Sequence, residues 1–365
     1  MSGSFGKGII ALAMLGCVIT PVSAAKKVIE FGWDEPDTAF IRAHIEEMKR
    51  TPFDGCVFHL LYQENEGSRN FCWDDWGKRA ITDQQLAPAL EDLKATRFGR
   101  FTENFLRFNV CPGDVDWFDD FSAILGNARQ AARIVRAVPA VKGILFDIEQ
   151  YNAQLFEYGR QAQAGSKGWD EYAAQVRLRG RELMEAFQSE CPDVVIFLTF
   201  GYCLPWYQSG GRPLSEANYG LLAPLLDGML EAAGPRVRFV DGHEASYPYR
   251  TVDQFRGAID VMRTGVLPVI ADKERYAAKF SFGFGVWLDM DWRGRGWDTR
   301  HLLMNYFTPT QFEEAVTNAL SVADEYVWVY TEVPRWWTPA GGPKDLPRIY
   351  EDVLRRAKRA AGGGA

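Results

Sequence analysis

Short runs of β-branched and aromatic residues alternate with helical stretches along almost the whole of this chain. The predicted strands are residues 28–33, 55–61, 104–110, 143–148, 194–200, 237–240, 282–288 and 326–330. Apolar residues spaced by three and four predict helices at residues 38–49, 83–94, 117–138, 170–189, 219–233, 252–263, 309–323 and 346–360. Eight strands, each followed by a helix, predict an α/β fold with a single (β/α)8 TIM barrel and long loops after the strands. An open, doubly wound sheet is the alternative, but no GxGxxG motif follows any strand.

The first 25 residues have the pattern of a signal peptide. Lys7 precedes an apolar stretch over residues 8–22, and Val22-Ser23-Ala24 offers the small residues at which signal peptidase cuts. We therefore expect a signal peptide at residues 1–25, one barrel domain over residues 26–361, and a disordered tail at residues 362–365. The mature protein is expected to be secreted or periplasmic, with no membrane attachment unless Cys17 is lipidated.

Charge and motif content exclude several classes of function. The 41 Lys and Arg residues face 48 Asp and Glu residues, a net charge of −7 that leaves no basic excess for a nucleic-acid partner. The four histidines form no HxH or HExxH motif, and no GxSxG or P-loop motif occurs, so the sequence predicts no metal and no cofactor. The five cysteines after residue 25 allow at most two disulfides, and equally allow buried free thiols.

Polar and aromatic residues gather just after the predicted strands. In a (β/α)8 barrel the carboxyl ends of the strands form one rim, which is where active sites of this fold are built. The candidates for substrate binding at this rim are Trp33, Asp34, His59, Asn109, Tyr151, His243, Tyr247, Trp287, Asp291, Glu332 and Trp337. For any single acid the plainer interpretation is a helix cap or an ion pair, and Asp37 is predicted to cap the helix that follows it. Trp33, Trp287 and one of Trp336 and Trp337 are expected to present a face to the cleft, whereas Trp117 is expected to be structural.

The sharpest signal is the pair Asp147 and Glu149 at the end of the fourth strand. Residues two apart on a strand project to the same side, and two neighbouring carboxylates cannot both ionise easily, so one pKa should rise. A carboxyl that stays protonated near neutral pH can donate a proton to a leaving oxygen. The alternative is a structural pair held by Arg107 or Lys142.

The stretch Gly143-Ile144-Leu145-Phe146-Asp147-Ile148-Glu149 resembles the end of the family 18 chitinase signature, and the predicted architecture resembles the (β/α)8 glycoside hydrolases. The resemblance implies Glu149 as the proton donor and Asp147 as its partner. The chain lacks the two earlier acidic positions of that signature, and its sixth strand continues into Asp241-Gly242-His243-Glu244 where the chitinases have a Tyr-Asp pair. The similarity therefore concerns the broad class, without a complete family motif.

These observations predict an exported glycoside hydrolase that cleaves a poly- or oligosaccharide with a pair of carboxylates. The second carboxylate is expected to be Glu244 or, failing that, Asp289, because these residues follow strands across the mouth from Glu149. Two alternatives stay open: a non-catalytic carbohydrate-binding barrel and a polysaccharide lyase. Arg293 and Arg295 are candidates to recognise an anionic sugar group, such as a carboxylate or sulfate; the alternative is that they lie on a solvated loop.

Overall fold

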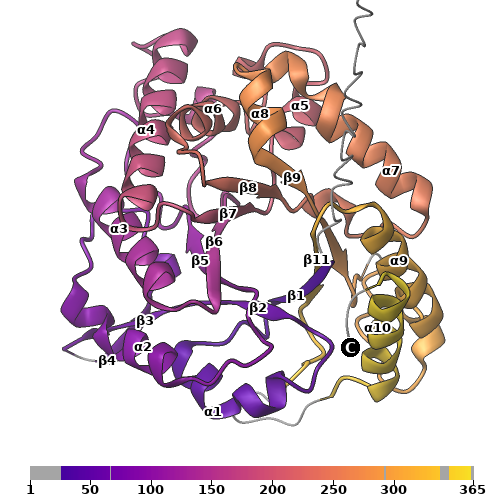
Figure 1. The fold of residues 1–365 in the computed structure, drawn as a ribbon. Coiled ribbons are helices and arrows are strands. Elements are labelled where there is room, and N and C mark those ends of the chain that lie inside the picture. Colours follow the sequence, from indigo (N-terminus) through magenta and orange to yellow (C-terminus); the bar gives the residue numbers. More distant parts are fainter. Residues whose placement is uncertain (1–25, 66, 292, 338–344, 363–365) are drawn as a thin grey trace, which may run out of the picture.

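The main sheet of the computed structural model, which describes residues 26–65, 67–291, 293–337 and 345–362, is a closed parallel barrel (Figure 1). Its strand order is β10-β11-β1-β2-β5-β6-β7-β8-β9, and every neighbouring pair is parallel. The strands are β1 (Lys27–Gly32), β2 (Gly55–Phe58), β5 (Asn104–Asn109), β6 (Val141–Asp147), β7 (Val195–Leu198), β8 (Arg238–Asp241), β9 (Phe280–Phe282), β10 (Phe284–Trp287) and β11 (Tyr326–Thr331). The predicted signal peptide lies outside the described residues, as do residues 363–365 of the predicted tail.

The barrel closes through a strand that is split at Gly283. β9 pairs with β8 and β10 pairs with β11, so residues 280–287 form one strand that joins the two ends of the sheet. Gly283 donates its N–H to the carbonyl of Asp241 (2.8 Å), and a Cβ atom there would lie 2.6 Å from the carbonyl oxygen of Tyr326. Counted this way the sheet has eight strands, and the predicted (β/α)8 barrel is confirmed.

Helices surround the sheet on its outer side (Figure 1). They are α1 (Thr38–Met48), α2 (Asp83–Ala95), α3 (Ser122–Ala137), α4 (Trp169–Glu190), α5 (Cys203–Ser209), α6 (Leu222–Ala232), α7 (Val252–Asp260), α8 (Lys273–Lys279), α9 (Pro309–Val322) and α10 (Arg348–Ala360). Asp37 caps α1 as predicted, because its side chain accepts the N–H of Phe40 (2.7 Å). The helix predicted from residue 117 begins only at Ser122, since Trp117 is buried and donates its indole N–H to the carbonyl of Leu155 (2.8 Å).

Two hydrophobic layers hold the barrel together. Ile29 and Phe31 of β1 point into the barrel interior, where they pack with residues such as Val57, Phe105 and Trp328. The second layer lies between the sheet and the helices and contains most of the other buried apolar side chains. Five free thiols, all buried, belong to the described residues: Cys56, Cys72, Cys111, Cys191 and Cys203. No helix in the described part of the chain is long and apolar enough to cross a membrane.

The sequence pattern missed three elements that lie in the connections. A hairpin of β3 (Leu61–Glu64) and β4 (Gly67–Asn70) follows β2, in a stretch predicted to be a loop. The short helices α5 and α8 were also not predicted. Each is too short to show a clear hydrophobic period, and the hairpin strand β4 consists of polar residues.

Candidate active site

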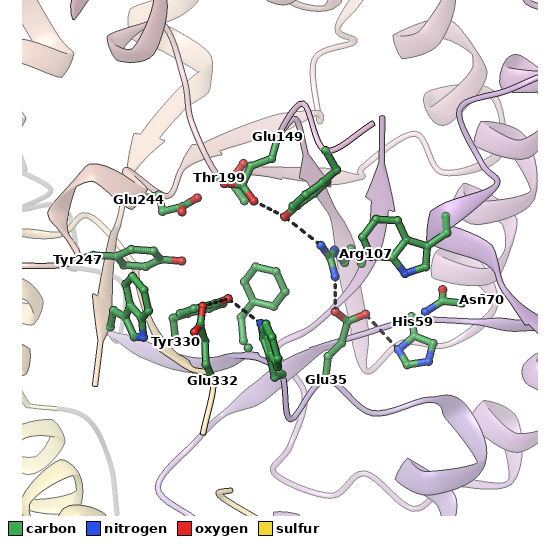
Figure 2. Close-up of a pocket in the computed structure, with 16 residues that line it drawn as sticks. Glu35, His59, Asn70, Arg107, Glu149, Thr199, Glu244, Tyr247, Tyr330 and Glu332 are labelled. Atoms are coloured by element: carbon green, nitrogen blue, oxygen red, sulfur yellow. Dashed lines mark hydrogen bonds and ion pairs between the residues drawn. The ribbon is translucent and has the colours of Figure 1, made fainter. Parts of the chain in front are cut away.

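A cavity of about 650 Å³ opens at the carboxyl ends of the barrel strands (Figure 2). Its lining comes from the ends of the barrel strands and from the hairpin after β2. The lining residues are Phe31, Gly32, Trp33, Glu35, His59, Asn70, Trp73, Arg107, Glu149, Tyr151, Thr199, Glu244, Tyr247, Trp287, Tyr330 and Glu332. This is the rim at which the sequence predicted a site.

Arg107 of β5 is the charged centre of one side of this cavity. Its Nη2 lies 2.6 Å from Oδ2 of Asp147, and its Nη1 lies 2.8 Å from Oε2 of Glu35. Nδ1 of His59 lies 3.1 Å from the other oxygen of Glu35. Burial alone would raise the pKa of Glu35, but Arg107 and then His59 outweigh it and hold the pKa below its ordinary value. Arg107, and not Lys142, is thus the residue that holds Asp147.

Tyr151 connects this charged group to Glu149. The Tyr151 hydroxyl lies 3.1 Å from Oδ2 of Asp147 and accepts a hydrogen bond from Nη2 of Arg107 (3.3 Å). The same hydroxyl is hydrogen-bonded to the carboxyl of Glu149. Burial, and then the charge of Asp147, raise the pKa of Glu149 above its ordinary value. The expectation that one pKa of the Asp147 and Glu149 pair rises is confirmed for Glu149.

Glu244 faces the same part of the cavity from the connection after β8. Its backbone N–H donates to the carbonyl of Thr199 (3.1 Å), and the preceding residue, His243, has a left-handed backbone (φ 41°) that turns the chain here. Figure 2 shows the carboxyl groups of Glu149 and Glu244 pointing toward one another. Burial, and then the charges of Glu149 and Asp147, raise the pKa of Glu244 well above its ordinary value. The two carboxyls therefore interact.

Aromatic rings form the wall that faces these acids. Trp33 is 67% exposed and donates its indole N–H to the hydroxyl of Tyr330 (3.1 Å), which in turn donates to Glu332 (3.2 Å). The rings of Tyr247 and Trp287 stand edge to face at 5.6 Å. Flat aromatic faces beside polar groups are suited to the apolar faces of sugar rings.

Seven of the predicted site residues do not line the cavity: Asp34, Asn109, Asp147, His243, Asp289, Asp291 and Trp337. Asp147 lies beneath the cavity, almost fully buried against Arg107. Asn109 and His243 are also buried. Burial lowers the pKa of His243 to about 4, so the ring is neutral at neutral pH.

Three of the aspartates bind backbone groups instead. Asp34 accepts the N–H groups of Trp336 (2.6 Å) and Trp337 (3.3 Å). Both tryptophans are fully buried, so the expectation that one of them faces the cleft is wrong.

Asp289 accepts the N–H groups of Glu332 (3.1 Å) and Val333 (2.8 Å), which fixes the rim after β11. Asp291 accepts those of Arg295 (2.8 Å) and Gly296 (2.7 Å) within its own loop. A short carboxylate after a strand is well placed to satisfy the N–H groups of a tight loop, and this is the physical reason for the three corrections.

The sequence interpretation also missed residues that the structure brings to the cavity. They are Glu35, Phe31, Gly32, Asn70, Trp73, Thr199 and Tyr330, together with Arg107, which the sequence suggested only as a structural partner of Asp147 and Glu149. An arginine inside an otherwise apolar strand needs a carboxylate partner, so Arg107 could also have been placed at the site itself. Asn70 and Trp73 come from and just after the hairpin that the pattern did not predict.

No protein-family model matches the sequence, and no curated protein matches it. Solved structures similar to this one include an endocellulase from the archaeon Pyrococcus horikoshii, with 11% identity, 93% of each chain covered and a TM-score of 0.42. Another is GH5_18 from Streptomyces cattleya in complex with GlcNAc, with 10% identity, 92% of this chain and 81% of that chain covered, and a TM-score of 0.47. A third is an alpha-amylase from Geobacillus thermoleovorans complexed with acarbose, with 11% identity, coverage of 93% and 79%, and a TM-score of 0.47. The strand pairing itself establishes the barrel.

Proposed function

We propose that the protein is a glycoside hydrolase that cleaves a glycosidic bond in a poly- or oligosaccharide, with Glu149 as the general acid and Glu244 as the second carboxylate. The observation that carries the proposal is the pair of half-buried carboxyls, both with a raised pKa, that face one cavity opposite an aromatic wall. Glycosidic hydrolysis needs two facing carboxyls in different protonation states, because one must protonate the leaving oxygen while the other, ionised, attacks the sugar or activates water.

The hydrogen bonds around Tyr151 support a protonated Glu149. A phenol has one proton, so Tyr151 can donate to only one of its two carboxyl neighbours. Asp147 and Glu149 compete for that proton, and the raised pKa of Glu149 favours the protonated form of Glu149. If Tyr151 donates to Asp147, then Glu149 must supply the proton of its own hydrogen bond to Tyr151. The arrangement thus stores at Glu149 the proton that general acid catalysis consumes.

Glu244 is left with the second role. In a retaining enzyme it would attack the sugar carbon, and in an inverting enzyme it would take a proton from the attacking water. NMR of the first product distinguishes the two, because the anomeric configuration is kept in one case and reversed in the other.

The charges around the cavity support a neutral sugar, or one that carries an amino group. Among the described residues that line the cavity, Arg107 is the one Lys or Arg. It is already bound to Glu35 and Asp147. Arg295 lines a different, much smaller hollow together with Asp291. A uronate carboxylate would meet no available counter-charge among these described lining residues, which weighs against the polysaccharide lyase. As part of the same proposal, the enzyme acts after export directed by residues 1–25.

The decisive experiment compares two amide variants on a panel of polysaccharides and on an activated aryl glycoside. We expect Glu149→Gln to lower turnover of the natural linkage by about 10²–10⁴-fold, because the transferable proton is lost. The aryl glycoside should be far less affected, since its leaving group needs little protonation. Glu244→Gln should lose activity on both substrates. The matched control is Glu216→Gln, which changes an exposed carboxylate outside the cavity and should keep wild-type turnover.

Two results would count against the proposal, the first against the role of Glu149 and the second against the hydrolase itself. Turnover of the natural linkage by Glu149→Gln within about threefold of wild type, far below the expected 10²-fold loss, would remove the general acid from Glu149. A wild-type protein that binds a member of the panel and cleaves none would replace the hydrolase with a non-catalytic carbohydrate-binding barrel.

A further inference from the structure

A second cavity, of about 630 Å³, lies at the amino ends of the strands, on the face opposite the candidate active site. Four separate segments form it: the start of β1, the turn between α1 and β2, the turn before β5, and the end of α10. The lining residues are Lys26, Lys27, Lys49, Arg50, Thr51, Pro52, Asp54, Arg100, Arg355, Lys358 and Arg359. Its volume is in the range of ligand pockets and exceeds what one small inorganic anion would fill.

The lining of this basic cavity has an unusual balance of charge. Eight of its eleven residues are Lys or Arg and one is an aspartate, in a chain whose net charge is −7. Three ion pairs reduce the excess: Lys358 with Asp54 (2.6 Å), Lys49 with Glu46 (2.6 Å) and Lys27 with Glu103 (3.7 Å). Eight cations against three carboxylates leave an excess of five positive charges around one cavity.

Helix capping accounts for some of these cations, but it does not neutralise them. Arg100 donates to the carbonyl of Phe53 (2.8 Å) and also to those of Lys49 and Thr51, where α1 has ended. Lys358 donates to the carbonyl of Pro52 (2.9 Å). A carbonyl accepts a hydrogen bond without cancelling the charge of the donor. Within the described part of the chain, the side chains of Arg50 and Arg359 make no ion pair with a carboxylate.

The cations of this cavity disfavour one another. Lys358 is 8% exposed, and burial together with Arg100 and Lys27 lowers its pKa despite the pairing with Asp54. The pKa of Arg100 is also lowered, first by burial and then by the positive charge of Arg355. A bound polyanion would relieve both costs, since it supplies the missing negative charge where solvent is partly excluded.

We propose that this basic cavity is a binding site for a ligand with phosphate groups that carry at least two negative charges in total. Arginine forks match phosphate oxygens in pairs, and Arg50, Arg355 and Arg359 supply three of them at the edge of the cavity. The ligand is either a free phosphorylated molecule or the headgroup of an anionic phospholipid. The site is separate from the candidate active site, so the proposal does not depend on the glycosidase activity.

The test uses inorganic pyrophosphate as the probe and isothermal titration calorimetry as the readout. We expect one saturable site per chain, with an affinity that falls as sodium chloride is added. The double variant Arg355→Gln and Arg359→Gln should bind about 10²-fold more weakly, roughly tenfold for each lost charge-assisted hydrogen bond. The matched control is Arg212→Gln with Arg256→Gln, which removes two exposed arginines elsewhere on the surface and should keep wild-type affinity.

A parallel arm identifies the source of the phosphate. Sedimentation with phosphatidylglycerol vesicles, but not with phosphatidylcholine vesicles, and its reversal by pyrophosphate would indicate a lipid headgroup. Pyrophosphate binding without sedimentation would indicate a free ligand. The proposal is overturned if pyrophosphate shows no saturable binding, or if the double variant binds it as tightly as the Arg212 and Arg256 control.

Discussion

Two cavities at opposite ends of this barrel have nearly the same volume, about 650 and 630 Å³, and opposite charge. Carboxylates outnumber cations at the mouth, whereas lysines and arginines surround the opposite end. The fold itself favours this polarity, because each helix of a (β/α)8 barrel begins near the carboxyl ends of the strands and ends near their amino ends. Helix N-termini stabilise acids and helix C-termini stabilise cations, although each interaction is worth only about 0.3–1 kcal/mol.

The helix dipoles do not explain why like charges are concentrated at these two cavities. At the mouth, the excess includes Glu149 and Glu244, two half-buried carboxyls that line the same cavity, where the charge of Glu149 raises the pKa of Glu244. At the opposite end, the excess consists of cations that line a single half-open cavity. In both cavities the protein keeps like charges close together. This costs free energy, and such clusters are typical of sites where a ligand or a reaction needs the charges.

The largest expected effect is a loss of stability when Arg107 is removed from its ion pairs with Glu35 and Asp147. Arg107→Met leaves Glu35 and Asp147 buried without their cation, and these side chains are only 8% and 1% exposed. We expect the free energy of unfolding to fall by about 3–5 kcal/mol in urea titrations near neutral pH. Arg256→Met removes an exposed arginine that is paired with Asp253 and should change it by less than about 0.5 kcal/mol. Equal losses in the two variants would mean that the Arg107 cluster contributes nothing special.

The sequence predicted the strands and the rim of the candidate active site better than the side chains that line it. Strand and helix periods are repeated signals, so the barrel and its rim could be read, and Glu149 and Glu244 follow from their places after β6 and β8. Which acids face solvent could not be read, because it depends on backbone N–H groups that come close only after folding. Asp34 and Asp289 look like Glu149 in the sequence, yet each binds the backbone of a loop distant in the chain.

The basic cavity illustrates the same limit more strongly. Its lining comes from residues as far apart as Lys26 and Arg359, and no local motif connects them. The net charge of −7 argued against a nucleic-acid partner and gave no sign of a local basic excess. A chain average cannot report a local excess that four distant segments assemble, so this feature needed the fold.

A smaller effect is expected from changing one charge next to the proposed acid. Asp147 raises the pKa of Glu149 and Arg107 lowers it. In Asp147→Asn the negative charge is lost and that of Arg107 is less compensated, so both changes lower the pKa of Glu149. The alkaline limb of the pH profile of kcat/KM should therefore move to lower pH. Asp291→Asn makes the same exchange outside the cavity and should leave the profile in place. A shift of the limb to higher pH would contradict the assigned electrostatics.

The smallest expected effect compares how the two ends of the barrel respond to pH. The raised pKa values of Glu149 and Glu244 mean that the folded protein binds more protons than the unfolded chain above about pH 4.3, so their contribution to stability falls as the pH rises through this window. Lys358 acts with the opposite sign. Its lowered pKa means that the unfolded chain binds more protons below about pH 10.4, so stability rises with pH as Lys358 loses its proton in the folded state.

Two substitutions isolate the contribution of Lys358, whose slope cannot exceed about 1.4 kcal/mol per pH unit. Lys358→Met removes both the titration and the pairing with Asp54, whereas Lys358→Arg removes the titration and keeps a cation beside Asp54. Urea titrations between pH 7 and 10 should show a flatter rise of stability in both variants, with the arginine variant the more stable of the two. A rise as steep as that of the wild type in both would mean that Lys358 does not carry the cost of the enclosed positive charge, and that the contrast between the two cavities has no energetic counterpart at this residue.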